Sequence, residues 1–127
     1  MSAPRRILVV DDHPDNARMV ALLLTLRGHT CRTALNGTEA LAVFAEFSPE
    51  IAILDIGLPD ISGYELATAL RERAGSAIFL AALTGWGQYE DRAKAFAAGF
   101  DQHLVKPVDG EKLLGIVSEA EARLNPA

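Results

Sequence analysis

Four short apolar runs, each followed by a polar residue, constrain the fold of this 127-residue chain more than any other feature. The inner runs are almost continuously apolar, which is typical of strands that are covered on both faces of a sheet. The polar residues that follow the runs are, in chain order, Asp11-Asp12, Asp55, Thr84 and Lys106-Pro107. If the strands lie parallel in one sheet, these polar groups meet at the same edge.

Longer segments with helical spacing alternate with these runs. We expect strands at Ile7–Val10, Thr30–Ala34, Ile51–Leu54, Ala77–Leu83 and His103–Val105. We expect helices at Pro14–Arg27, Gly37–Phe47, Ile61–Arg73, Gln88–Ala98 and Val108–Leu124. Gly28 and Gly99 should end the first and fourth of these helices, and Asp109 can cap the last. Five βα repeats predict one α/β domain over residues 1–127, a doubly wound five-stranded parallel sheet with helices on both faces.

Composition excludes several classes of protein. The chain has no apolar stretch of the roughly 20 residues that a membrane helix needs, and its start leads directly into a strand, so we expect no membrane span and a cytoplasmic location. A net charge of −5 disfavours direct binding of nucleic acid. Cys31 is the single cysteine, and we expect it to act as a small buried apolar residue.

The acids at the strand ends suit a hard divalent cation. Such ions take oxygen ligands and retain several waters, so Asp11, Asp12 and Asp55 suffice if the first and third strands are neighbours. Lys106 and the cation would then balance the clustered negative charge. Taken singly, each residue has a simpler interpretation: the acidic pair as a helix cap, Thr84 as a turn residue, and Lys106 as a solvated lysine. The prediction depends on the whole set occurring at strand ends.

The ordered set resembles the response-regulator receiver domain of bacterial two-component signalling. The matching residues are Asp11-Asp12, Asp55-Ile56-Gly57-Leu58-Pro59, Gly63, Thr84 and Lys106-Pro107, and the steps from Asp12 through Asp55 and Thr84 to Lys106 are 43, 29 and 22 residues. The resemblance covers residues 6–123. It implies a flavodoxin-like (βα)5 fold with strand order 2-1-3-4-5, and a signalling domain rather than an enzyme.

The resemblance also implies a chemistry for the acids. Asp55 would accept a phosphoryl group from a phosphohistidine of a histidine kinase or a histidine phosphotransfer protein. Asp12, Asp55 and the backbone carbonyl of Gly57 would ligate Mg²⁺, or Mn²⁺ in its place. Asp11 would act mainly through a metal-bound water.

By the same resemblance, Lys106 would pair with the phosphoryl oxygens, the Thr84 hydroxyl would move in to bind one of them, and the Lys106-Pro107 bond would be cis. The family usually has an aromatic switch residue where this chain has His103, which acts either as that switch or as a plain edge histidine. Trp86 is either a loop aromatic or a lid over the acyl phosphate. The segments around Thr84 and Lys106 resemble receivers attached to hybrid histidine kinases.

The first helix is apolar on both sides, with Ala17, Val20, Ala21 and Leu24 on the core side. Met19 and Leu22 on the other side either pack against the last helix or form a docking surface for the phosphodonor. His13 and His29 lack further histidine or cysteine at ligand spacing, so we expect both to be solvated. We expect a monomer or weak dimer.

Other functions remain as alternatives. A pseudo-receiver would bind partners without phosphorylation. A phosphatase of the haloacid-dehalogenase type would need a second aspartate at the position of Gly57. A flavodoxin-like or P-loop binder would need a glycine-rich phosphate loop, and the first strand is followed by two acids instead. We expect either a stand-alone receiver or one unit of a larger kinase or regulator.

Overall fold

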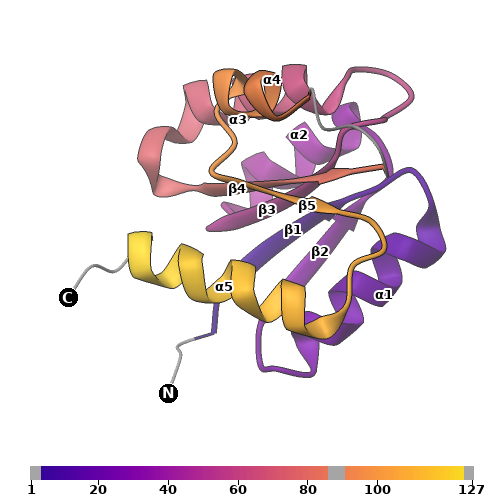
Figure 1. The fold of residues 1–127 in the computed structure, drawn as a ribbon, viewed down its shortest axis with the longest axis vertical. Coiled ribbons are helices and arrows are strands. Elements are labelled where there is room, and N and C mark those ends of the chain that lie inside the picture. Colours follow the sequence, from indigo (N-terminus) through magenta and orange to yellow (C-terminus); the bar gives the residue numbers. More distant parts are fainter. Residues whose placement is uncertain (1–3, 86–90, 125–127) are drawn as a thin grey trace.

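The computed structural model describes residues 4–85 and 91–124, and its five strands form one parallel sheet in the order β2-β1-β3-β4-β5 (Figure 1). The strands are β1 (Arg6–Val10), β2 (Thr30–Ala34), β3 (Ile51–Asp55), β4 (Phe79–Thr84) and β5 (Gln102–Val105). The helices are α1 (Pro14–Thr25), α2 (Gly37–Phe47), α3 (Gly63–Ala74), α4 (Asp91–Ala98) and α5 (Gly110–Leu124). The predicted fold class and strand order are confirmed.

Helices cover both faces of the sheet: α1 and α5 lie on one face, and α2, α3 and α4 lie on the other (Figure 1). Alternate residues of each central strand face the two layers, because successive side chains of a strand point to opposite sides. In β1, for example, Leu8 and Val10 pack with α2 and α3, whereas Ile7 and Val9 pack with α1 and α5. The chain therefore has two apolar cores separated by the sheet.

The burial of the strands follows their order in the sheet. All residues of β3 and β4 are buried, and β1 is buried except at Arg6. The edge strands β2 and β5 are mostly exposed or half-buried, which agrees with their more polar sequences. Cys31 on β2 is half-buried and packs against the core formed with α1 and α5. No helix among the described residues has both the length and the apolar character that crossing a membrane requires.

Polar caps move several helix ends from the predicted positions. Helix α3 begins at Gly63 rather than Ile61 because the Ser62 side chain caps it, accepting a hydrogen bond from the Glu65 amide at 3.1 Å. Helix α5 begins at Gly110 rather than Val108, since Asp109 accepts a hydrogen bond from the Lys112 amide at 2.9 Å. The first residues of the predicted fourth helix, 88–90, lie outside the described residues.

Two further boundaries differ from prediction by two residues, and the remaining differences in the described elements are of one residue. Helix α1 ends at Thr25, two residues early, and the chain then turns at Gly28, whose φ of +94° favours glycine. Strand β4 begins at Phe79 because Gly75–Ala77 form a short 3₁₀ turn before it. The cap by Asp109 and the helix-ending turns at Gly28 and Gly99 are confirmed.

The expectation for His29 is wrong. His29 is only 7% exposed, and its Nδ1 atom accepts a hydrogen bond from the Arg5 amide at 3.0 Å. The turn at Gly28 returns the chain to the start of β1, where the Thr30 amide donates to the Arg5 carbonyl oxygen. The imidazole is therefore enclosed by the sheet edge instead of facing solvent.

Candidate functional site

Parallel register brings the predicted polar residues to one edge of the sheet. Val10 at the end of β1 pairs with Leu54 of β3, so Asp11 and Asp55 follow on neighbouring strands. Asp55 pairs in turn with Leu83 of β4, the residue before Thr84. The convergence expected from the sequence therefore results from pairing between strands that are distant in the chain.

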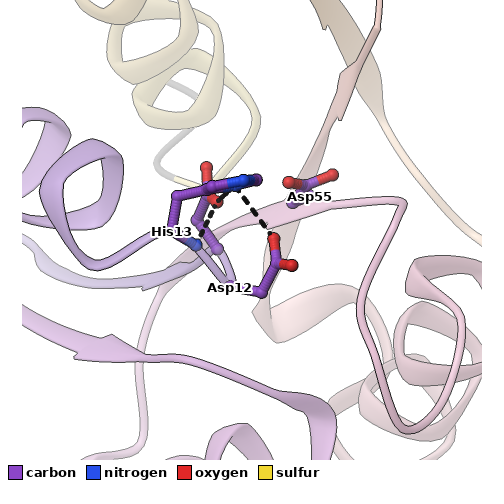
Figure 2. Close-up of side chains that lie close together, drawn as sticks. Asp12, His13 and Asp55 are labelled. Carbon is purple, nitrogen blue, oxygen red and sulfur yellow. Dashed lines mark hydrogen bonds and ion pairs between the residues drawn. The ribbon is translucent and has the colours of Figure 1, made fainter.

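The acids lie together with an unexpected neighbour. Single donor atoms of Asp11, Asp12, His13 and Asp55 all lie within 4.8 Å of one another, and Figure 2 shows Asp12 and His13 from the loop after β1 beside Asp55 from the end of β3. Asp11 is 1% exposed and Asp55 is 8% exposed, so two of the carboxylates are largely shielded from water. We call these four residues the acidic cluster.

Lys106 supplies the positive charge beside the acidic cluster. Its Nζ atom donates a hydrogen bond to Asp55 Oδ2 at 2.8 Å and lies 3.4 Å from Asp11 Oδ2. Burial lowers the pKa of Lys106, but the hydrogen bond to Asp55 and the charges of Asp55 and Asp11 outweigh burial and raise this pKa above its ordinary value of 10.5. The peptide bond between Lys106 and Pro107 is cis, as expected.

Thr84 is the last residue of β4 and is 1% exposed. Its hydroxyl donates a hydrogen bond to the Leu104 carbonyl oxygen of β5 at 3.3 Å. The Lys106 amide donates to the Thr84 carbonyl oxygen at 2.9 Å, which connects the end of β4 to the loop that carries the lysine. The hydroxyl is thus bonded to the edge strand in this structure.

The backbone around Gly57 and Gly63 is held tightly. The Gly57 amide donates to Asp55 Oδ1 at 2.9 Å, and the Gly63 amide donates to the Ile56 carbonyl oxygen at 2.9 Å. A Cβ at Gly63 would lie only 2.6 Å from Ile56 Cα and 2.7 Å from the Asp55 carbonyl oxygen. Position 63 requires glycine because α3 begins directly against the backbone of the residue expected to accept the phosphoryl group.

Asp60 anchors the same loop to α2. Its carboxylate accepts hydrogen bonds from the Gly37 and Thr38 amides at 2.8 and 2.9 Å, and from the Thr38 hydroxyl at 2.8 Å. These bonds hold the pKa of Asp60 well below its ordinary range, and the bond from the Gly37 amide has the largest effect on this pKa. The sequence motifs did not indicate this anchor, although an acid in a loop and a small residue at a helix start are the features that such a cap requires.

The structure brings together Asp11, Asp12, Asp55 and Lys106, four of the residues that the sequence singled out. It adds His13, which is exposed as predicted but whose ring contacts two carboxylates. The sequence signal was its position directly after the acidic pair. His103 is half-buried on β5, and Trp86 lies outside the described residues.

Both predicted docking residues on α1 are exposed, Met19 by 54% and Leu22 by 56%. Met19 also lines a cleft that reaches Asp11 and Lys106, together with Pro107 and Val108 of the loop before α5. The neighbouring Leu23 packs against the core shared with α5. On the second apolar side of α1, Leu23 therefore packs inward, whereas Met19 and Leu22 are exposed and Met19 borders the cleft at the cluster.

The donor atoms of the acidic cluster fit a divalent cation. Carboxylate oxygens are the preferred ligands of Mg²⁺. Asp12 Oδ1 is a buried atom that accepts no hydrogen bond from the described residues, so its lone pairs are unused. An unsatisfied buried acceptor beside two further carboxylates is the arrangement that a cation would satisfy.

Comparisons with known proteins identify the family. The model of the response regulator receiver domain matches residues 7–118. A protein of Leptolyngbya boryana, "Uncharacterized 14.6 kDa protein in sodA1 3'region", is 35% identical over 114 residues, which cover 89% of this chain and 87% of that protein. The transcriptional regulatory protein KdpE of Mycobacterium tuberculosis is 36% identical over 117 residues, covering 92% of this chain but 51% of KdpE. This chain thus spans about half the length of KdpE.

A solved structure agrees with this match. The crystal structure of a CheY-like response regulator receiver domain protein from Methanospirillum hungatei JF-1 superposes with a TM-score of 0.89 at 26% identity, over 98% of this chain and 100% of that one. Domains of this family act in signalling and bind Mg²⁺ at an acidic site. The chain belongs to the response regulator receiver domain family of two-component systems.

Proposed function

We propose that Asp55 is the phosphoacceptor of this receiver domain and takes its phosphoryl group from the phosphohistidine of a histidine kinase or a histidine phosphotransfer protein. The observation that carries the proposal is the contact between Asp55 Oδ2 and Lys106 Nζ at 2.8 Å within the acidic cluster. It places a carboxylate nucleophile beside a cation that can balance phosphoryl charge. We propose that the single domain extends over residues 1–127.

In the proposed transfer, an Asp55 carboxylate oxygen attacks phosphorus while the bond from phosphorus to the donor imidazole nitrogen breaks. The electron pair of that bond stays on the nitrogen. Phosphoryl transfer depends chiefly on in-line positioning and on stabilisation of charge on the equatorial oxygens. Lys106 would move from the Asp55 carboxylate to a phosphoryl oxygen, since the two oxygens carry similar charge.

A divalent cation held by Asp12, Asp55 and the Gly57 carbonyl oxygen would supply further positive charge to the phosphoryl oxygens when bound. Asp11 would hold one of its waters. Mg²⁺ is the expected ion, because these ligands are all oxygens. Gly57 lies in the loop that Asp60 anchors to α2, which supports a fixed position for its carbonyl oxygen.

The Thr84 hydroxyl would leave the Leu104 carbonyl oxygen and bind a phosphoryl oxygen. This exchange would release one hydrogen bond between β4 and β5 and change the surface near His103. Altered binding to a partner would be the output. Phosphorylation of Asp55 would thus alter the surface at β5, the strand to which Thr84 is bonded before phosphorylation.

Exposure to acetyl phosphate and Mg²⁺ tests the acceptor. We expect the intact mass of the wild-type chain to rise by one HPO₃ group, and we expect Asp55→Asn to gain nothing because its amide is a poor nucleophile. Asp15→Asn is the matched control, since it makes the same chemical change at an exposed residue of α1 outside the acidic cluster. It should be labelled like wild type.

Two results would contradict the proposal. Labelling of Asp55→Asn at the wild-type level would locate the acceptor elsewhere. A folded wild-type chain that gains no phosphoryl group, with native secondary structure confirmed by circular dichroism, would favour a pseudo-receiver that binds partners without phosphorylation.

A further inference from the structure

We propose that His13 is a direct ligand of the divalent cation at the acidic cluster, and that its imidazole nitrogen shifts the preference of the site from Mg²⁺ towards nitrogen-binding dications such as Zn²⁺. The inference rests on the proposed function only in requiring a cation at this cluster. An all-oxygen site and a site with one imidazole differ in the ions that they select, because imidazole suits Zn²⁺ and Ni²⁺ whereas Mg²⁺ favours oxygen.

The spacing of the donor atoms supports a shared ion. His13 Nδ1 lies 3.1 Å from Asp12 Oδ1 and 3.3 Å from Asp11 Oδ1. Adjacent ligands of an octahedral ion with bonds of about 2.1 Å stand about 3.0 Å apart, and opposite ligands stand about 4.2 Å apart. All four donor atoms of the cluster lie within 4.8 Å of one another, so small side-chain rotations would bring His13, Asp12 and Asp55 to one ion while Asp11 holds one of its waters.

His13 Nδ1 contacts both carboxylates of the acidic pair. It lies within hydrogen-bond distance of Asp11 Oδ1 at 3.3 Å, where the tautomer of the ring decides whether Nδ1 carries a proton. Asp12 Oδ1, 3.1 Å from Nδ1, is buried and has no hydrogen-bond partner among the described residues. With the ring proton on Nε2, a cation would bind the Nδ1 lone pair and the unused lone pair of Asp12 Oδ1 together.

The backbone holds the imidazole at the cluster. The His13 amide donates to Asp11 Oδ1 at 2.9 Å, and His13 directly precedes Pro14, the first residue of α1. Lys106 contacts the Oδ2 atoms of Asp11 and Asp55, whereas His13 contacts Oδ1 of Asp11. The lysine and the imidazole thus occupy different sides of the Asp11 carboxylate, so one does not displace the other.

Nuclear magnetic resonance of chain labelled with ¹⁵N in its histidine rings tests this ligand directly. The chain has three histidines, so each ring can be assigned by substitution. We expect one equivalent of Zn²⁺ to shift the Nδ1 resonance of His13, and excess Mg²⁺ to reverse the shift by competing for the same site. His103→Gln is the matched control and should retain the shift.

Two variants separate a shared site from a surface histidine. We expect Asp12→Asn to abolish the Zn²⁺-dependent shift of His13, because the ion would lose a neighbouring ligand. We expect His13→Asn, which keeps an N–H group able to donate to the carboxylates, to weaken Zn²⁺ binding by about tenfold or more in calorimetry. Its Mg²⁺ affinity should change far less, so the ratio of the two affinities falls.

Each other outcome overturns the proposal. Competition between Zn²⁺ and Mg²⁺ without a shift at His13 would remove the histidine as a ligand and leave the proposed function intact. A shift that survives Asp12→Asn would indicate an isolated surface histidine. A folded chain that binds neither ion would overturn both this inference and the role of a cation in the proposed function.

Discussion

At the scale of single residues, Lys106 balances the charge of the acidic cluster. Asp11 and Asp55 are both buried. The Lys106 Nζ atom lies 3.4 Å from Asp11 Oδ2 and 2.8 Å from Asp55 Oδ2. Removing one partner of a buried ion pair costs more than the pair itself contributes, because the remaining charge is left without compensation. The lysine therefore contributes to stability as well as to the proposed chemistry.

We expect Lys106→Met to lower the free energy of unfolding by about 2 kcal/mol at neutral pH, less than the cost of breaking a fully buried pair because the lysine is partly exposed. The pKa of Lys106 is raised in the folded chain, so its contribution is complete below its ordinary value of 10.5 and is lost as pH rises through the raised pKa. Urea unfolding between pH 7 and pH 12 measures the difference between the two proteins.

The difference between wild type and Lys106→Met should narrow only at the alkaline end of that range. Added Mg²⁺ should reduce it at neutral pH, because the ion also neutralises the acids. A difference that stays constant beyond pH 10.5 would contradict this account of Lys106.

At the scale of elements, α1 presents an apolar surface beside the acidic cluster. Met19 and Leu22 are more than half exposed, and Met19 lines the cleft that reaches Lys106. An exposed apolar surface next to a reactive group suits a partner that must bring its own reactive group to that point. We therefore assign the phosphodonor to this surface as a proposal.

We expect Leu22→Asp to slow phosphoryl transfer from the cognate phosphohistidine protein by roughly tenfold, because placing a charge in an apolar contact costs more than about 1 kcal/mol. Transfer from acetyl phosphate should not change. Phe96→Asp is the control: it adds the same charge to an apolar residue that is 60% exposed on α4, at the opposite face of the sheet from α1. Rapid-quench measurement with both donors checks the prediction, and equal loss with both donors would contradict a docking role.

Element boundaries also show where sequence prediction stops. The helical and strand periods located the five strands and five α-helices that the structure describes, because a period is a local property of the chain. The start of α3 depended on whether Ser62 or an earlier residue capped it, and the start of β4 on the 3₁₀ turn at Gly75–Ala77. These are competitions between neighbouring hydrogen bonds, which an apolar pattern does not register.

At the scale of the whole molecule, an ion-pair network closes the sheet edge opposite the acidic cluster. Asp101, just before β5, accepts hydrogen bonds from Arg71 of α3 at 2.7 Å and from Arg123 of α5 at 2.6 Å. It also accepts one from the Leu80 amide of β4 at 2.8 Å. Both arginines donate to the Ile78 carbonyl oxygen. The network connects helices from the two faces of the sheet through a single carboxylate.

We expect Asp101→Asn to lower the free energy of unfolding by about 2 kcal/mol, because charge-assisted hydrogen bonds to two arginines become weaker. Phosphorylation by acetyl phosphate should stay at the wild-type level, since the network lies at the far edge of the sheet. Glu46→Gln is the matched control: its pair with Arg32 is 3.5 Å long and exposed, so its loss should have no measurable effect. Impaired phosphorylation in Asp101→Asn would show coupling between the two edges.

The sequence by itself determined the alternation of strands and helices, the polar residue at the end of each central strand, and the set Asp11, Asp12, Asp55, Thr84 and Lys106. These follow from periodicity and from residue type, which are properties of short segments. The parallel sheet then followed from the order of the elements. The fold, and the residues of the proposed acceptor site, could therefore be predicted from the sequence.

Only the tertiary structure decided which polar groups meet. It enclosed His29 against Arg5, placed the ring of His13 on Asp11 and Asp12, and bonded Thr84 to β5 rather than to the cluster. Each of these contacts depends on the distance and direction between atoms that the chain pattern leaves open. A buried polar group takes the partner that the packed backbone brings within reach, and that partner is a property of the whole fold.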